Sequence, residues 1–256
     1  MLIGVVKEGL MSKAEPEESL DGKHVAIVAM GQSQIDFHLS QAHSVHFDEI
    51  WAINAMIGII PNVDRAFILD PMSRFLDTKD AGSMTEMMRK KLPLVDYPIY
   101  SCEVDERVPA VEEYPLEEVT YYTKTGYLNN TVAYALAYAL WQRVQQVSLF
   151  GIDFTYKTNM HFAEAGRGCL EFWIAKCIAD GMNVGIAPRS SLLDTDVEIK
   201  EKLYGYHRLD NPKVTYLDQD GDTRVCLWSD LQAEETKKPI GIISRKDITP
   251  VEPNKY

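Results

Sequence analysis

Long apolar runs are missing from this chain of 256 residues, and none approaches the ~18 residues that a membrane-spanning helix requires. The first twenty residues mix acidic and basic side chains with apolar ones, which breaks up any secretory apolar segment. We therefore expect a cytoplasmic protein without a membrane span, in which residues 1–20 form an acidic leader.

Cysteine is scarce as well, and the four cysteines of the chain have no CxxC spacing. This pattern suggests neither a zinc ribbon nor a framework of disulfides. His38, His43 and His46 lie close together, but they lack the i, i+4 spacing of a zinc-binding helix. We predict that the chain has no metal site.

Positive charge is in short supply, because the formal net charge at pH 7 is −12. Binding along a nucleic-acid backbone draws on clustered lysine and arginine, so a broad nucleic-acid surface is not expected. Three motifs are also absent: the dinucleotide fingerprint G-x-G-x-x-G, the Walker loop and the nucleophile elbow G-x-S-x-G. Their absence argues against a P-loop kinase and a serine hydrolase.

Short β-branched runs separated by helical stretches dominate the part that remains. Strands are expected at His24–Val28, Glu49–Asn54, Arg65–Asp70, Tyr97–Cys102, Val147–Phe150 and Asn183–Pro188. Residues 129–144 predict a helix that is apolar on every side and hence buried, and Ala165–Asp180 predicts another. The alternation indicates an α/β fold, with a doubly wound, mostly parallel Rossmann-like sheet and helices on both faces.

Composition divides the chain into three parts. Residues 21–193 are expected to form the Rossmann-like catalytic domain, within which the Glu- and Pro-rich stretch 103–118 reads as a surface excursion or lid, followed by a short strand at Val119–Tyr122. In the remainder, 194–256, two β-rich runs flank Asp218–Asp222 and predict a hairpin, because the glutamate of a calcium loop is missing. A polar tail follows.

Polar residues follow several of the expected strands. Gly31, Asn54 and Asp70 come at strand ends and are candidates for one ligand-binding rim, because ligands of open α/β sheets bind outside the carboxyl ends of the strands. Thr125 and Gly126 precede the buried helix, whose start could bind an anion or simply be capped.

The strand Val147–Phe150 leads into a loop that carries an acid, a phenol and an imidazole: Asp153, Tyr156 and His161. Asp153 could either hold the loop together or contact a ligand hydroxyl. His161 fits a general acid or base, because imidazole changes its charge between pH 5 and 8.

Several motifs in this order resemble the single-domain bacterial sialyltransferases that use a CMP-sugar, and also the related 6-hydroxymethylpterin diphosphokinase-like and flagellin-glycosylation domains. The motifs are Gly31-x-Ser33, Asn54, Thr125-Gly126, Ser148-Leu-Phe-Gly-Ile-Asp-Phe154, His161 and Pro188-Arg-Ser-Ser-Leu192. The aromatic residue that follows Phe154 in that family stands here at Tyr156.

The resemblance implies a glycosyltransferase-like enzyme that moves a sugar from a nucleotide-activated donor to a hydroxyl acceptor, without metal or tightly bound cofactor. It implies that Tyr156 faces the donor phosphate and that His161 is the general base. The nucleotide would be held by Gly31, Ser33, Asn54, Thr125 and Gly126, with Asp70 and Asp153 as further candidates.

Two alternatives stay open. One is a pyrophosphoryl transferase acting on a small alcohol, in which Mg²⁺ would bridge the phosphates. The other is a non-catalytic nucleotide-binding or assembly module that uses the leader and the tail as contact surfaces. The acceptor is not identified, and a homo-oligomer is compatible with either.

Overall fold

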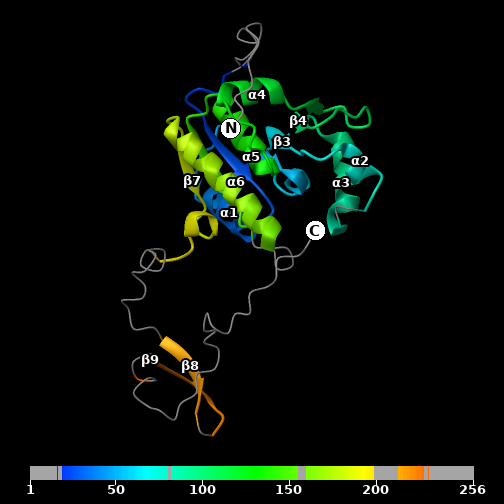
Figure 1. Cartoon of the computed structure of the whole chain (residues 1–256). Coiled ribbons are helices and arrows are strands. Elements are labelled where there is room, and N and C mark those ends of the chain that lie inside the picture. The colour runs from blue at the N-terminus through cyan, green and yellow to red at the C-terminus, as the bar shows by residue number, and fades with distance from the viewer. Residues whose placement is uncertain are drawn as a thin grey trace, which may run out of the picture. The chain divides into compact units, whose positions relative to one another are not determined.

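The computed structural model describes residues 16, 19–79, 82–154, 160–198, 213–218, 220–227 and 230 (Figure 1). The chain divides into two units, Met1–Asp196 and Val197–Tyr256, each of which is described by itself below. The first unit contains a parallel sheet with its helices, and the second contains a hairpin.

The sheet of the first unit has seven strands in the order β5-β4-β3-β2-β1-β6-β7, and every neighbouring pair is parallel. This confirms the expected fold class. The strands are β1 (His24–Val28), β2 (Glu49–Ile53), β3 (Arg65–Phe67), β4 (Ile99–Ser101), β5 (Val111–Glu113), β6 (Gln146–Phe150) and β7 (Asn183–Ile186). From β1 the chain adds strands on one side up to β5, then returns to place β6 on the other side of β1.

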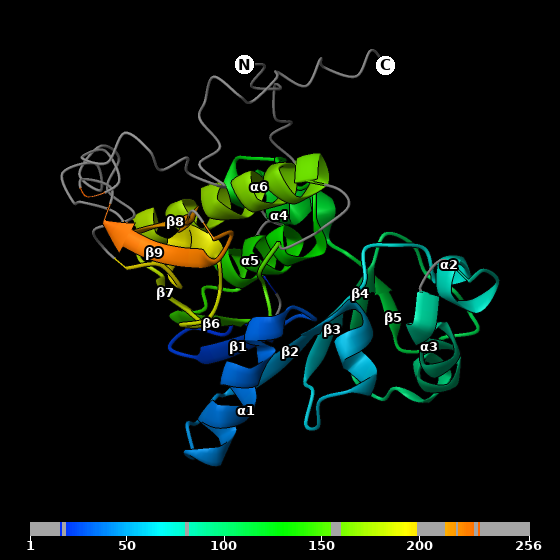
Figure 2. The ribbon, with the colours of Figure 1, turned by 90° about the horizontal axis from the view of Figure 1, so that it is seen from below.

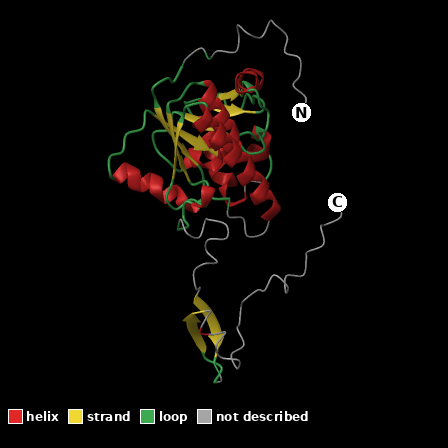
Figure 3. Ribbon diagram, turned by 60° about the vertical axis from the view of Figure 1, so that its left-hand side comes forward, coloured by secondary structure: helices red, strands yellow, loops and turns green. Residues whose placement is uncertain are grey.

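Helices cover both faces of this sheet. Figure 2 shows α4, α5 and α6 on one side and α1 on the other, and Figure 3 shows the strands lying between the helices. The helices are α1 (Ile35–Ala42), α2 (Met72–Leu76), α3 (Thr85–Lys91), α4 (Leu116–Thr123), α5 (Thr131–Trp141) and α6 (Met160–Ala179), with short 3-10 turns between several of them. Among the described residues, no helix combines the length and the apolar character needed to cross a membrane.

The central strand β1 explains the two-layered core, because its side chains alternate between the faces. Val25 and Ile27 pack into the cluster formed with α5 and α6. Ala26 and Val28 pack into a second cluster with α1, α2 and α3. A strand buried on both faces has to be apolar, which is why the four buried residues Val25–Val28 form an unbroken apolar run.

Helix α5 lies in the middle of the first cluster, and nine of its eleven residues are buried. Its first turn is capped by Asn130, whose side-chain oxygen accepts from the backbone N–H of Ala133 at 3.0 Å. The prediction of a buried helix over 129–144 is therefore confirmed, with the ends trimmed to Thr131 and Trp141.

Residues 111–122 differ from the expected excursion and short strand. Val111–Glu113 forms the edge strand β5, paired with β4, so the supposed excursion contributes to the sheet. The strand expected at Val119–Tyr122 is instead part of helix α4, in which Val119 and Thr123 are buried one turn apart. The β-branched residues misled the prediction, whereas Glu117 and Glu118 in the first turn suit the positive end of a helix.

A second correction concerns the start of α6. The expected loop from Asp153 to His161 ends earlier, because α6 begins at Met160 and His161 lies in its first turn. The predicted helix over Ala165–Asp180 is thus extended by more than one turn. Its buried positions, among them Cys169, Trp173 and Cys177, follow the helical spacing that the sequence predicts.

The second unit contains the predicted hairpin, with β8 (Lys213–Leu217) antiparallel to β9 (Thr223–Leu227). In the turn, the Asp218 carboxylate accepts from the backbone N–H groups of Asp220 and Asp222 and from the Arg224 side chain. Asp218 thus acts as a turn residue, as expected. The predicted polar tail, Leu231–Tyr256, lies outside the described residues.

Replacing Leu136 in α5 by alanine should lower the free energy of unfolding by about 2–5 kcal/mol, because a fully buried side chain leaves a cavity behind. Urea denaturation measures the change. Leu94 is the matched control: its side chain is 78% exposed, and Leu94→Ala should change stability by less than about 0.5 kcal/mol. Equal effects of the two substitutions would contradict the buried position of α5.

Candidate functional site

A cavity of about 920 Å³ opens at the carboxyl ends of β1, β2, β3 and β6, where residues that follow these strands line it. The start of α5, part of α2 and the first turn of α6 complete its wall. It lies where the strand order reverses between β1 and β6, which is the usual ligand position in a doubly wound sheet. Its polar lining residues are Gln32, Asn54, Asp70, Arg74, Asn129, Asn130, Thr131, Tyr134 and Asp153.

Two loops meet at the back of this cavity, one after β1 and one after β6. The Gly31 N–H donates to the Gly151 carbonyl at 2.7 Å, and the Gly151 N–H donates to the Ser33 hydroxyl at 2.9 Å. The approach leaves no room for a side chain on Gly31, since an added Cβ would lie 2.4 Å from the Asp153 carboxylate and 2.6 Å from the Gly151 carbonyl. Gly31 is thus required by close packing of backbone on backbone.

Asp153 is 94% buried between these loops, because only 6% of it is exposed. One carboxylate oxygen, Oδ2, accepts from the Ser33 backbone N–H at 2.8 Å. The other, Oδ1, is buried and has no hydrogen-bond partner among the described residues. A buried acceptor without a donor is costly, and Asp153 lines the cavity, which makes this oxygen a candidate acceptor for a donor group of a ligand.

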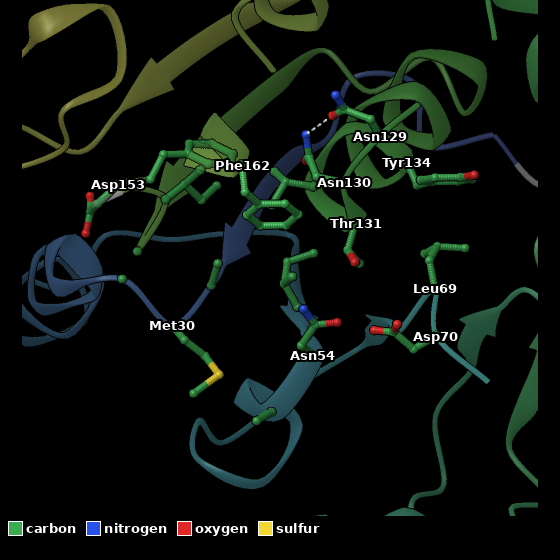
Figure 4. A pocket seen from close by; sticks show the side chains of 18 of the residues that line it. Met30, Asn54, Leu69, Asp70, Asn129, Asn130, Thr131, Tyr134, Asp153 and Phe162 are labelled. Carbon is green, nitrogen blue, oxygen red and sulfur yellow. Dashed lines mark hydrogen bonds between the residues drawn. The ribbon is translucent and has the colours of Figure 1, made fainter. Parts of the chain in front are cut away.

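Asn54 provides a second acceptor of the same kind. It follows β2 directly and has a φ of 52°, a left-handed conformation that asparagine tolerates better than most residues. Its side-chain Oδ1 is also buried without a partner among the described residues. In Figure 4 Asn54 and Asp70 lie below Thr131 and Asn130, with Asp153 and Met30 on the left.

The start of α5 contributes polar groups to the opposite wall. The first N–H groups of a helix lack acceptors within the helix, and they carry its positive dipole end. Around them, Asn129 and Asn130 donate to the carbonyls of Ala165 and Gly166 in α6, each at 3.1 Å. These two contacts hold the first turns of α6 beside the start of α5. Burial raises the pKa of Tyr134, so its hydroxyl stays protonated and can donate.

The loop after β7 supports the site from behind. The Ser190 hydroxyl donates to the Ile152 carbonyl at 2.7 Å, and the Ser191 hydroxyl donates to the Asp153 carbonyl. Arg189 forms an ion pair with the buried carboxylate of Asp36 in α1. Residues 188–192 of the sequence motif therefore fix the backbone that carries Asp153.

The structure brings Gly31, Asn54, Asp70 and Asp153 together around one cavity, as the sequence predicts for strand ends. It places three other candidates elsewhere. Ser33 is fully buried and joins the two loops, while Thr125 and Gly126 lie several residues before α5 and do not line the cavity.

Of the two catalytic candidates, His161 and Tyr156, the structure describes only His161. His161 is exposed in the first turn of α6, and its neighbour Phe162 lines the cavity. Tyr156 lies outside the described residues. Sequence reasoning missed Arg74, which stands four residues after Asp70 and forms an ion pair with it. For Thr131 and Tyr134 the sequence predicts no role beyond their place in a buried helix.

Among the described residues, no group of three or more His, Cys, Asp or Glu side chains is arranged to hold a metal ion. The carboxylates of the cavity are instead those of Asp70, next to Arg74, and Asp153, next to Ser33. The site offers hydrogen-bond acceptors, a helix start and one guanidinium to a ligand.

No protein-family model matches the chain, and no curated protein matches it. Solved structures of the sialyltransferase CstII from Campylobacter jejuni are similar to it at 15% sequence identity, over 66% of this chain and 82% of that chain. The TM-score is 0.41 for the complex with the substrate analogue CMP-3FNeuAc and 0.40 for the complex with cytidine-5'-monophosphate. At this level of similarity, function has to be argued from the cavity itself.

Replacing Gly31 by alanine should destabilise the fold by about 1–3 kcal/mol, because the added methyl group overlaps the Asp153 carboxylate and the Gly151 carbonyl. Since Gly31 has a φ of −67°, the backbone itself accepts alanine and the effect is purely steric. Thermal unfolding measures it. Gly168→Ala in α6 is the control, because nothing lies within 4 Å of an added Cβ and alanine favours a helix by up to about 1 kcal/mol. A neutral Gly31→Ala would show that the two loops are not in contact.

Proposed function

We propose that this chain is a glycosyltransferase-like enzyme that binds a nucleotide-activated sugar and transfers the sugar to a hydroxyl acceptor. The observation that carries the proposal is that Asp153, which lines a cavity at the switch point of the sheet, has a buried Oδ1 with no partner among the residues that the structure describes. A ligand with hydroxyl or amino donors would satisfy it, and nucleotides carry both on the ribose and the base.

The cavity is suited to a molecule of that size. Its volume of about 920 Å³ lies within the range of about 300–1,000 Å³ that is common for small-molecule sites. Asp153 and Asn54 would accept hydrogen bonds from the nucleoside part. The start of α5 would favour the negatively charged phosphate, because the dipole of a helix is positive at its N-terminal end. The donor is a substrate, and no tightly bound cofactor is part of the proposal.

His161 is the proposed general base. It lies in the first turn of α6, whose next residue, Phe162, lines the cavity. In the reaction the acceptor oxygen would form a bond to the anomeric carbon, while the bond from that carbon to the phosphate oxygen breaks with its electron pair. His161 would take the proton of the acceptor hydroxyl, a role worth about 10²–10⁴-fold in rate. Tyr156 is proposed to face the leaving phosphate.

Replacing His161 by alanine should lower kcat by about 100-fold or more and leave nucleotide affinity nearly unchanged, because the imidazole moves a proton and does not bind the nucleotide. Sugar-transfer assays and titration calorimetry measure the two quantities. His43→Ala is the matched control: His43 is exposed at the C-cap of α1 and does not line the cavity. A His161→Ala variant with full activity would exclude His161 as the base.

Removing divalent metal with EDTA should leave sugar transfer unchanged, because the proposed mechanism has no step that uses a metal ion. Activity is measured before and after chelation, with CMP, UDP and GDP sugars tested as donors. Turnover of ATP that stops on chelation would support the pyrophosphoryl-transferase alternative instead. If no nucleotide binds in calorimetry, with or without Mg²⁺, the glycosyltransferase proposal fails. That result would favour the non-catalytic alternative.

A further inference from the structure

The charges on the cavity wall are unbalanced for an anionic ligand. Among the described residues that line it are two carboxylates, Asp70 and Asp153, and one positively charged side chain, that of Arg74. The chain as a whole has a net charge of −12. A phosphate group that enters this cavity therefore meets repulsion from the carboxylates unless it lies against Arg74 or the start of α5.

Arg74 has hydrogen-bonding capacity left over. It forms an i, i+4 ion pair with Asp70 through one nitrogen, Nη1, which donates to Asp70 Oδ1. Within the described part of the chain, this bond uses one of the five N–H donors of the guanidinium. The remaining donors can bind a ligand. The two side chains remain 45% and 34% exposed, so a ligand in the cavity can reach the guanidinium.

The backbone of Arg74 is held in place from the other side. Arg89 in α3 donates through Nε to the Leu76 carbonyl at 2.9 Å and through Nη2 to the Thr78 carbonyl at 2.7 Å. The Thr78 hydroxyl in turn donates to the Arg74 carbonyl at 2.6 Å. The short helix α2 is thus tied to α3, and Asp70 orients the guanidinium at the cavity wall.

We propose that Arg74 binds the phosphate group of the ligand, with Asp70 as its positioning residue. The inference rests on the proposed function, because it assigns the phosphate of the nucleotide donor to this side chain. A guanidinium can form two parallel, charge-assisted hydrogen bonds to phosphate oxygens. An exposed i, i+4 ion pair adds little to stability, so a role of Arg74 in binding and a role in folding give different results on mutation.

Inorganic pyrophosphate, titrated into the full chain by calorimetry, tests the assignment without a base or a sugar. Arg74→Gln should weaken its binding by about 10- to 100-fold, as expected for lost charge-assisted hydrogen bonds, with little change in Tm. Arg107→Gln is the matched control: Arg107 also pairs with carboxylates, those of Asp77 and Asp105, but it does not line the cavity. Arg107→Gln should bind pyrophosphate like the unmodified chain.

Two results would overturn the assignment: unchanged pyrophosphate binding by Arg74→Gln, or no binding of pyrophosphate by the unmodified chain. Cytidine and CMP separate this inference from the proposed function. If CMP binds more tightly than cytidine and Arg74→Gln removes the difference, the result supports both the assignment of Arg74 and the proposed function. If the difference persists in Arg74→Gln, the assignment of Arg74 fails while nucleotide binding stands. If pyrophosphate binding depends on Arg74 but no nucleotide binds, the proposed function fails and the phosphate site remains.

Discussion

The contact between the loops after β1 and β6 is the constraint on which the candidate site depends. Gly31 and Gly151 share a backbone hydrogen bond, and Ser33 links both loops through its hydroxyl and its N–H. Gly151 itself has a φ of 67°, and a side chain there would run into the Ala29 carbonyl. These contacts occupy one oxygen of Asp153, while the other is buried and has no partner in the part of the chain that the structure describes. Asp153 therefore belongs both to the loop architecture and to the candidate site.

The second constraint is the burial of α5. Because its side chains are apolar on every side, the helix lies inside the protein, and its N-terminal end points from the core toward the strand ends. The same burial places its capping residue Asn130 against Gly166 of α6. Packing of one helix thereby decides where the polar groups of the opposite cavity wall are found.

The parallel sheet and the rim of strand ends could be predicted from the sequence, because His24–Val28 and Val147–Phe150 are short, mostly apolar runs typical of strands that are covered on both faces. The residues from 111 to 123 could not, since their local preference for strand or helix is weak and tertiary packing decided between them. Arg74 was missed for another reason: its position on the cavity wall depends on α2 folding back against α3, a contact that no local pattern signals.

The hydrogen bond between Ser33 and Asp153 joins residues that are 120 positions apart in the chain. Strand β1 pairs with β2, the next strand in the chain, but its other edge pairs with β6, which comes only after β3, β4 and β5. Closing so long a loop is entropically unfavourable and belongs to the slow part of folding. A nascent chain that has not been synthesised past Asp153 has no cavity, so competence to bind a ligand arises only once the two halves of the sheet have joined.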